Sequence, residues 1–171
     1  ELDDDSFTQA CVSDLVQLLD MTDAGGFAAL IAEPIQGVGG FATPPDGFFG
    51  AMHKVLSANE ILFISDEVQT GWGRTGEHFW GYEAHGIVPD ILTFAKGVGN
   101  GITLAGCVAR AELVNVIDRT LSTTFGGNPL SVAAGRATLK YVKENDLQAN
   151  AARRGKQMTE LLSGECDATD W

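Results

Sequence analysis

Four short, mostly apolar runs constrain this sequence most. They lie at residues 28–32, 61–64, 91–95 and 104–109. Runs of this kind are typical of strands in a parallel sheet, because both faces of such strands are covered. The segments with a helical spacing of apolar residues are 8–20, 44–58, 111–119, 129–145 and 149–162. This alternation predicts an α/β domain with a mostly parallel central sheet flanked by helices.

The amino-acid composition of the chain limits the kinds of partner that we expect it to bind. The chain has 171 residues, of which 44% are hydrophobic, and this suffices for one domain with a core. Its net charge is −12 and its Lys and Arg residues form no cluster, which argues against a nucleic-acid partner. No apolar segment reaches the length of a transmembrane helix, so we expect no membrane partner.

The cysteines and histidines are too scattered for a disulfide framework or a metal site. Cys11, Cys107 and Cys166 lie far apart in the sequence. The three histidines lack the i, i+4 spacing of a helical metal site. We therefore expect no metal and a reducing, cytoplasmic compartment. The chain starts at Glu1 without a methionine, and helical spacing begins almost at once, so we expect a central fragment of a longer protein.

Two polar side chains follow neighbouring strands of the expected sheet. Asp66 comes after the run 61–64, and Lys96 comes directly after the run 91–95. Ligands of open α/β sheets bind at the carboxyl ends of the strands. Asp66 needs a positive partner, either an arginine or backbone amide or a protonated ring nitrogen. Lys96 is either a solvated lysine or an amine made nucleophilic by a dry site.

The glycines after Lys96 allow a further interpretation. They permit close approach of a ligand, and Gly97-Val98-Gly99 also resembles the start of a dinucleotide-binding loop. That interpretation is weak, because the third glycine of the G-x-G-x-x-G pattern is missing and Gly101 comes one position early.

Four segments taken together indicate a protein family more specifically than any single residue does. They are AEPIQG at 32–37, SDEVQTGWGRTG at 65–76, PDILTFAKG at 89–97 and TFGGNP at 124–129. In this order they resemble class III aminotransferases, which use pyridoxal 5'-phosphate (PLP). The resemblance covers about residues 25–160 and is closest to the alanine–glyoxylate aminotransferase 2-like group. It implies the large domain of a fold type I PLP-dependent transferase, incomplete at both ends.

The resemblance implies roles for five residues. Lys96 would form the Schiff base with PLP and shuttle a proton, and Asp66 would pair with the pyridine nitrogen. Val68 would pack on one face of the ring, and Gln69 would reach its 3-oxygen. Thr124 would donate its hydroxyl to the cofactor phosphate across a dimer interface, so a homodimer is implied for the full-length protein.

The implied domain boundary follows residue 128. Residues 1–128 would belong to the PLP-binding domain, and 129–171 would hold an interdomain helix and the start of a C-terminal domain. The family's upstream phosphate-binding loop and downstream arginine for the substrate carboxylate are absent from this sequence.

The implied function is transfer of an amino group from an amino acid to a 2-oxo acid or glyoxylate. Val38 occupies the position where the ornithine and 4-aminobutyrate enzymes carry a glutamate, which favours the alanine–glyoxylate-like group. Two alternatives stay open. One is a PLP-dependent lyase acting on an amino-alcohol phosphate with the same fold, and the other is an inactive fragment.

Overall fold

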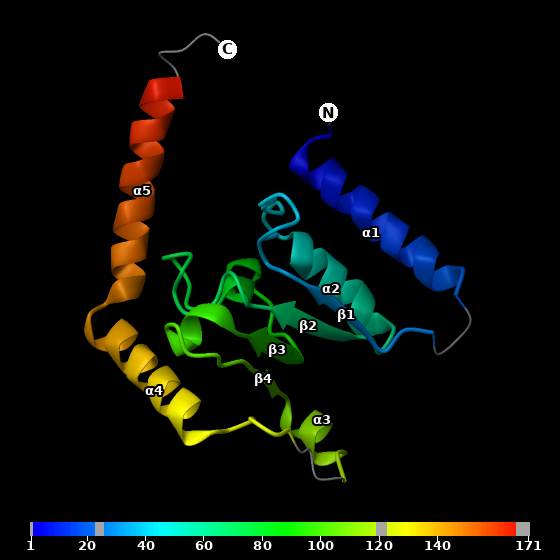
Figure 1. Cartoon of the computed structure of the whole chain (residues 1–171). Helices are drawn as coiled ribbons and strands as arrows, with labels where there is room; N and C mark the ends of the chain where they lie inside the picture. Colours follow the sequence, from blue (N-terminus) through cyan, green and yellow to red (C-terminus); the bar gives the residue numbers. More distant parts are fainter. Residues whose placement is uncertain (1, 23–25, 119–122, 167–171) are drawn as a thin grey trace.

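A four-stranded sheet forms the centre of the molecule (Figure 1). The computed structural model describes residues 2–22, 26–118 and 123–166. The sheet order is β1-β2-β3-β4, and the strands are β1 (Ala29–Ala32), β2 (Leu62–Asp66), β3 (Ile91–Phe94) and β4 (Gly106–Ala109). The first three strands run parallel, and β4 is antiparallel to β3. This arrangement confirms the expected α/β architecture with a mostly parallel sheet.

The strand boundaries differ from the sequence prediction. β2 extends two residues further than the apolar run, because Ser65 and Asp66 pair with Leu92 and Thr93 of β3. Asp66 is therefore the last residue of the strand rather than a residue beyond it. β3 ends at Phe94, so Lys96 does not close a strand but begins the short 3-10 helix η2 (Lys96–Gly99). β4 starts at Gly106, two residues later than expected.

Helices α1 (Asp4–Asp20) and α2 (Phe48–Ala58) lie side by side over one face of the sheet (Figure 1). α1 begins four residues before the expected position, because the Asp3 side chain accepts a hydrogen bond of 2.8 Å from the Ser6 N–H. α2 begins later than expected. Gly47 precedes it with a φ of 79°, a left-handed conformation that glycine adopts without strain.

The hydrophobic core lies between these two helices and the sheet. Its buried members are Leu15, Phe49, Leu56, Ile61, Phe63 and Ile87. Phe63 projects from β2 onto Phe49 of α2, with ring centroids 5.6 Å apart. The 3-10 helix η1 (Gly81–His85) closes one end of the core, where His85 packs edge-on against Phe49. Burial lowers the pKa of His85 below its ordinary value.

The C-terminal part is helical. It comprises α3 (Ala111–Asn115), α4 (Pro129–Glu144) and α5 (Leu147–Cys166). α3 ends at Asn115, while the last residue of its expected range, 119, lies outside the described residues. α5 extends beyond both expected ends. α4 packs on η2, and Gly135 has no room for a side chain because Leu104 lies against it. α5 extends away from the sheet (Figure 1). Within the described residues, no helix has both the length and the apolar character needed to cross a membrane.

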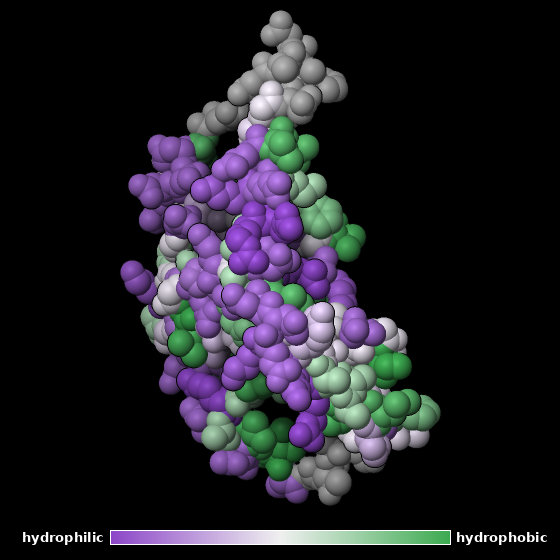
Figure 2. All heavy atoms as spheres, turned by 90° about the vertical axis from the view of Figure 1, so that its left-hand side faces the viewer, coloured by the Kyte–Doolittle hydropathy of each residue, from purple (hydrophilic) through white to green (hydrophobic). Residues whose placement is uncertain are grey.

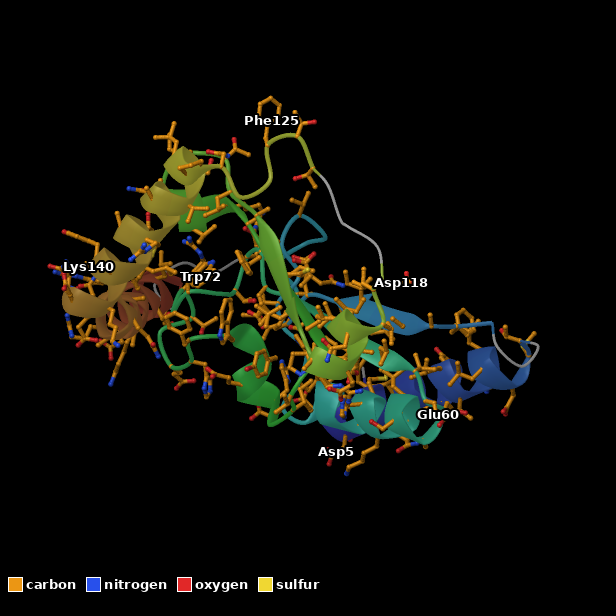
Figure 3. All side chains as sticks on the ribbon, turned by 90° about the horizontal axis from the view of Figure 1, so that it is seen from below. Asp5, Glu60, Trp72, Asp118, Phe125 and Lys140 are labelled. Carbon is orange, nitrogen blue, oxygen red and sulfur yellow. The ribbon has the colours of Figure 1, made fainter. Side chains whose placement is uncertain are left out.

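Many large apolar side chains remain exposed. Figure 2 shows such side chains interrupting a mostly hydrophilic surface on the side of α4 and α5. Exposure is high for Ile31 on β1, Leu130 and Tyr141 on α4, and Leu161 on α5. Phe125 is 81% exposed and points outward from the segment before α4 (Figure 3). Apolar surface of this extent is typical of regions that contact other protein segments.

We therefore predict that the isolated 171-residue chain self-associates at micromolar concentration. Sedimentation velocity should show species heavier than the 18.1 kDa monomer, because association removes the exposed apolar side chains from water. We also expect weak PLP binding or none. A soluble monomer that turns yellow with one equivalent of PLP would contradict this prediction.

Candidate active site at the carboxyl edge of the sheet

The carboxyl ends of β1, β2 and β3 meet at one edge of the sheet. Asp66 at the end of β2 stands opposite Thr93 of β3, and the Glu67 N–H donates to the Thr93 carbonyl at 3.0 Å. Lys96 follows three residues after Thr93. The structure therefore places Asp66 and Lys96 at the same edge of the sheet, on segments that continue neighbouring strands, as the sequence predicted.

Asp66 keeps an oxygen available for a ligand. Phe63 and Ser65 are buried toward α2, so the alternation of the strand turns Asp66 to the opposite face. Oδ1 accepts a hydrogen bond of 3.1 Å from the Val68 N–H. Among the described residues, no hydrogen bond to Oδ2 is present. A partly buried carboxylate with one unused oxygen can accept a hydrogen bond from a cationic ligand.

A cavity of about 600 Å³ lies next to this carboxylate. It lies between β1 with the loop after that strand and the helices α1 and α2, so its wall holds Phe7 and Met52 as well as Glu33, Gln36 and Asp66. Lys96 is not part of the wall. The structure therefore brings Asp66, but not the Lys96 side chain, to the cavity.

Lys96 has an unusual backbone conformation. Its φ is 51°, in the left-handed region that residues other than glycine rarely adopt. Val98 and Gly99, which follow in η2, are buried, while the Lys96 side chain is exposed. Within the described residues it forms no ion pair.

Gln69 joins the loops that follow β1 and β2. The Glu33 side chain accepts a hydrogen bond of 2.9 Å from the Gly37 N–H. A Cβ at Gly37 would lie 2.8 Å from the Gln69 amide nitrogen and 3.1 Å from a Glu33 oxygen. The Gln69 side chain therefore lies directly over Gly37, and this close approach requires glycine there. The sequence predicted a role for Gln69 but none for Glu33.

The other two predicted residues are less well defined by contacts. Val68 is partly buried beside Asp66, in a position consistent with packing against a ligand. Thr124 is exposed in the segment before α4, and no hydrogen bond joins its side chain to another described residue. Its predicted contact crosses a dimer interface, so its role stays a prediction.

The sequence analysis missed Glu67, whose side chain is 0% exposed. Its carboxylate accepts four hydrogen bonds, from the hydroxyls of Ser65 and Thr70 and the backbone N–H groups of Gly81 and Tyr82. We call these five residues the Glu67 cluster. Burial raises the pKa of the Tyr82 phenol, and the charges of Glu83 and Glu67 add to this effect. The only signal in the sequence was a pair of hydroxyl residues flanking the glutamate.

These groups fit PLP. The unused Asp66 oxygen suits a protonated ring nitrogen, the Lys96 amine suits an aldehyde, and the Gln69 amide suits a ring oxygen. Among the described residues, no group of three or more His, Cys, Asp or Glu side chains could hold a metal ion.

Known proteins are similar to this chain in sequence and in fold. The family model described as aminotransferase class-III matches residues 2–170. Alanine–glyoxylate aminotransferase 2 homolog 2, mitochondrial, from Arabidopsis thaliana is 44% identical over 151 residues, covering 88% of this chain and 31% of that protein. Acetylornithine aminotransferase from Corynebacterium efficiens is 40% identical over 158 residues, covering 92% of this chain and 39% of that protein.

A solved structure agrees with the computed one. The PLP-bound amine transaminase from an uncultivated Pseudomonas species superposes with a TM-score of 0.89 at 34% identity, over 97% of this chain and 39% of that chain. The chain thus spans roughly a third of the length of these relatives. The family match reaches from Leu2 to Asp170, beyond the limits of about 25 and 160 expected from the motifs. This chain belongs to the class III aminotransferase family, whose members are PLP-dependent.

Proposed function

We propose that the protein containing this chain is a PLP-dependent aminotransferase that moves an amino group from an amino acid to a 2-oxo acid or glyoxylate. The observation that carries the proposal is the placement of Asp66 and Lys96 at one edge of the sheet, on the continuations of adjacent strands. The names of the relatives support it, since they are alanine–glyoxylate and acetylornithine aminotransferases. The apolar Val38 favours the alanine–glyoxylate-like group.

Each side chain has a specific task in this proposal. PLP, when bound, supplies an electron-withdrawing ring that stabilises negative charge at the substrate Cα. The Asp66 carboxylate would accept a hydrogen bond from the ring nitrogen and so keep that nitrogen protonated. Lys96 would hold the cofactor through its Nζ, and the same Nζ would move a proton at the substrate Cα. Gln69 would orient the ring through its 3-oxygen, and Val68 would pack on one face.

The assembly and compartment are also proposals. Thr124 would donate its hydroxyl to the phosphate bound by a partner subunit, so the full-length protein would act as a homodimer. Cytoplasmic localisation stays a prediction from the scattered cysteines, and the Arabidopsis relative carries a mitochondrial name. The relatives described above are transaminases by name, which favours amino-group transfer over the lyase reaction.

A product assay with the full-length protein tests the reaction. With L-alanine and glyoxylate we expect pyruvate and glycine to form in equal amounts, because the amino group passes between the two substrates through one cofactor. Ammonia and phosphate are measured in parallel with an amino-alcohol phosphate as substrate. Release of ammonia and phosphate without any amino transfer would contradict the transaminase assignment and favour the lyase.

A further inference from the structure

The Glu67 cluster shows how the segment bearing the site is held. Oε1 of Glu67 accepts from the Ser65 hydroxyl at 3.0 Å and the Tyr82 N–H at 2.8 Å. Oε2 accepts from the Thr70 hydroxyl at 2.6 Å and the Gly81 N–H at 2.7 Å. Each oxygen thus accepts from one hydroxyl and one backbone N–H, so the hydrogen-bonding capacity of this fully buried carboxyl group is satisfied.

These bonds join parts of the chain that are distant in sequence. Glu67 and Thr70 belong to the segment that leaves β2, whereas Gly81 and Tyr82 begin η1. Backbone N–H groups cannot turn away from their partner as hydroxyls can. The position of η1 is therefore tied to the end of β2 through a single side chain.

Close packing around these hydrogen bonds leaves the two segments little room to move relative to each other. A Cβ at Gly81 would lie 2.7 Å from Thr70 Cβ and 2.8 Å from Pro34 Cβ. At Gly71 a Cβ would lie 2.7 Å from the Trp80 ring and 2.9 Å from the Glu67 carbonyl oxygen. Only glycine fits at both positions, so the two segments are held at a fixed separation.

The residues flanking Glu67 are those proposed to contact PLP. Asp66 precedes it, and Val68 and Gln69 follow it. The Glu67 side chain is anchored under η1, while its backbone N–H is anchored on Thr93 of β3. Because both the side chain and the backbone N–H of Glu67 are held, the backbone on either side of it has little freedom. The fixed backbone in turn sets the directions of the Asp66 and Gln69 side chains.

We propose that Glu67 is a positioning residue for cofactor binding: its buried hydrogen bonds aim the Asp66 carboxylate and the Gln69 amide at the cofactor ring. The inference rests on the proposed function, because it requires that PLP binds against Asp66. Glu67 touches neither cofactor nor substrate and acts only through its neighbours.

Glu67→Gln in the full-length protein tests the proposal. Glutamine keeps the size of the side chain, but its NH2 group must face one of the two backbone N–H groups, neither of which can accept a hydrogen bond. Glu83→Gln is the matched control. Glu83 accepts the N–H groups of Phe79 and Trp80 at 2.9 and 3.1 Å in the same loop, but it is exposed, so water can replace the lost bond.

Three measurements separate positioning from simple stability. They are the PLP dissociation constant, the pH titration of the bound cofactor's visible absorbance, and kcat with KM. For Glu67→Gln we expect a PLP dissociation constant raised about 10-fold and a shifted midpoint of the pH titration of the absorbance. We also expect a kcat about 100-fold lower, because small misplacements of reacting groups have effects of that order. Glu83→Gln should stay within about twofold of the unmodified protein in all three.

A second pair of variants decides the question if Glu67→Gln does not fold. Thr70→Val removes one hydroxyl donor from Oε2 with little change of shape, and Thr70→Ser restores that donor. We expect a smaller displacement of the absorbance titration in the same direction for Thr70→Val, and recovery for Thr70→Ser.

The outcomes against the proposal are distinguishable. Variants with a lowered melting temperature but an unchanged PLP dissociation constant and titration would show that the Glu67 cluster only stabilises the fold, which would overturn the proposal. Absence of PLP binding in the unmodified protein would instead overturn the proposed function, and this inference with it.

Discussion

Replacing Lys96 with alanine in the full-length protein is expected to reduce amino-group transfer on the order of 10⁴-fold, the upper end of what a positioned proton-transfer group contributes. The variant loses both the covalent hold on the cofactor and the group that moves the substrate Cα proton. The rate is measured as pyruvate formed from alanine. The matched control is Lys140→Ala, because Lys140 lies exposed on α4 (Figure 3) and only approaches Glu144 at 3.8 Å.

Borohydride reduction gives an independent readout of the same assignment. The unmodified protein should carry the reduced cofactor on one lysine, and peptide mapping should place it on Lys96. Lys96 lies at the same sheet edge as Asp66, whereas Lys54 belongs to α2 and Lys140 and Lys143 belong to α4. Label on any of those three lysines would refute the assignment.

Replacing Asp66 with alanine is expected to lower kcat roughly 10²–10³-fold, the typical effect of removing one preorganised electrostatic partner. Without the carboxylate the ring nitrogen loses its proton more easily, and the ring withdraws electrons less strongly. Cofactor affinity should fall far less than kcat, since packing and the covalent link to Lys96 remain. Steady-state kinetics and a PLP titration of the variant measure the two effects separately.

Glu60→Gln serves as the control for Asp66→Ala. Glu60 is exposed just before β2, at the opposite end from Asp66, so its loss should leave both kcat and cofactor affinity unchanged (Figure 3). Near-normal turnover of a correctly folded Asp66→Ala variant would exclude the proposed pairing of Asp66 with the ring nitrogen.

The strands were predictable because their signal is local. Each run is short and mostly apolar, and all four expected strands are present in the structure. The boundaries were less predictable, because pairing with a neighbouring strand decides where a strand ends. β2 continues through the polar residues Ser65 and Asp66 only because β3 offers partners there.

The ends of the helices were likewise predictable where the signal in the sequence is local, and less so elsewhere. Asn128 caps α4 by accepting a hydrogen bond of 2.9 Å from the Ser131 N–H, and Pro129 follows at the first helical position. Both signals are local, and the expected start of this helix was right. The expected end of α5 at residue 162 was wrong, since the helix continues to Cys166 although its apolar spacing weakens.

For the site, the sequence by itself determined that Asp66 and Lys96 follow neighbouring strands, because strand order and chain direction bring such positions to one edge of a parallel sheet. The tertiary structure alone decided how that edge is organised. Glu67 depends on donors 14 and 15 residues away, and Gln69 lies over Gly37 from a different loop. Two of the donors to Glu67 are backbone N–H groups, which every residue except proline carries. The pattern of side chains in a sequence therefore cannot reveal them.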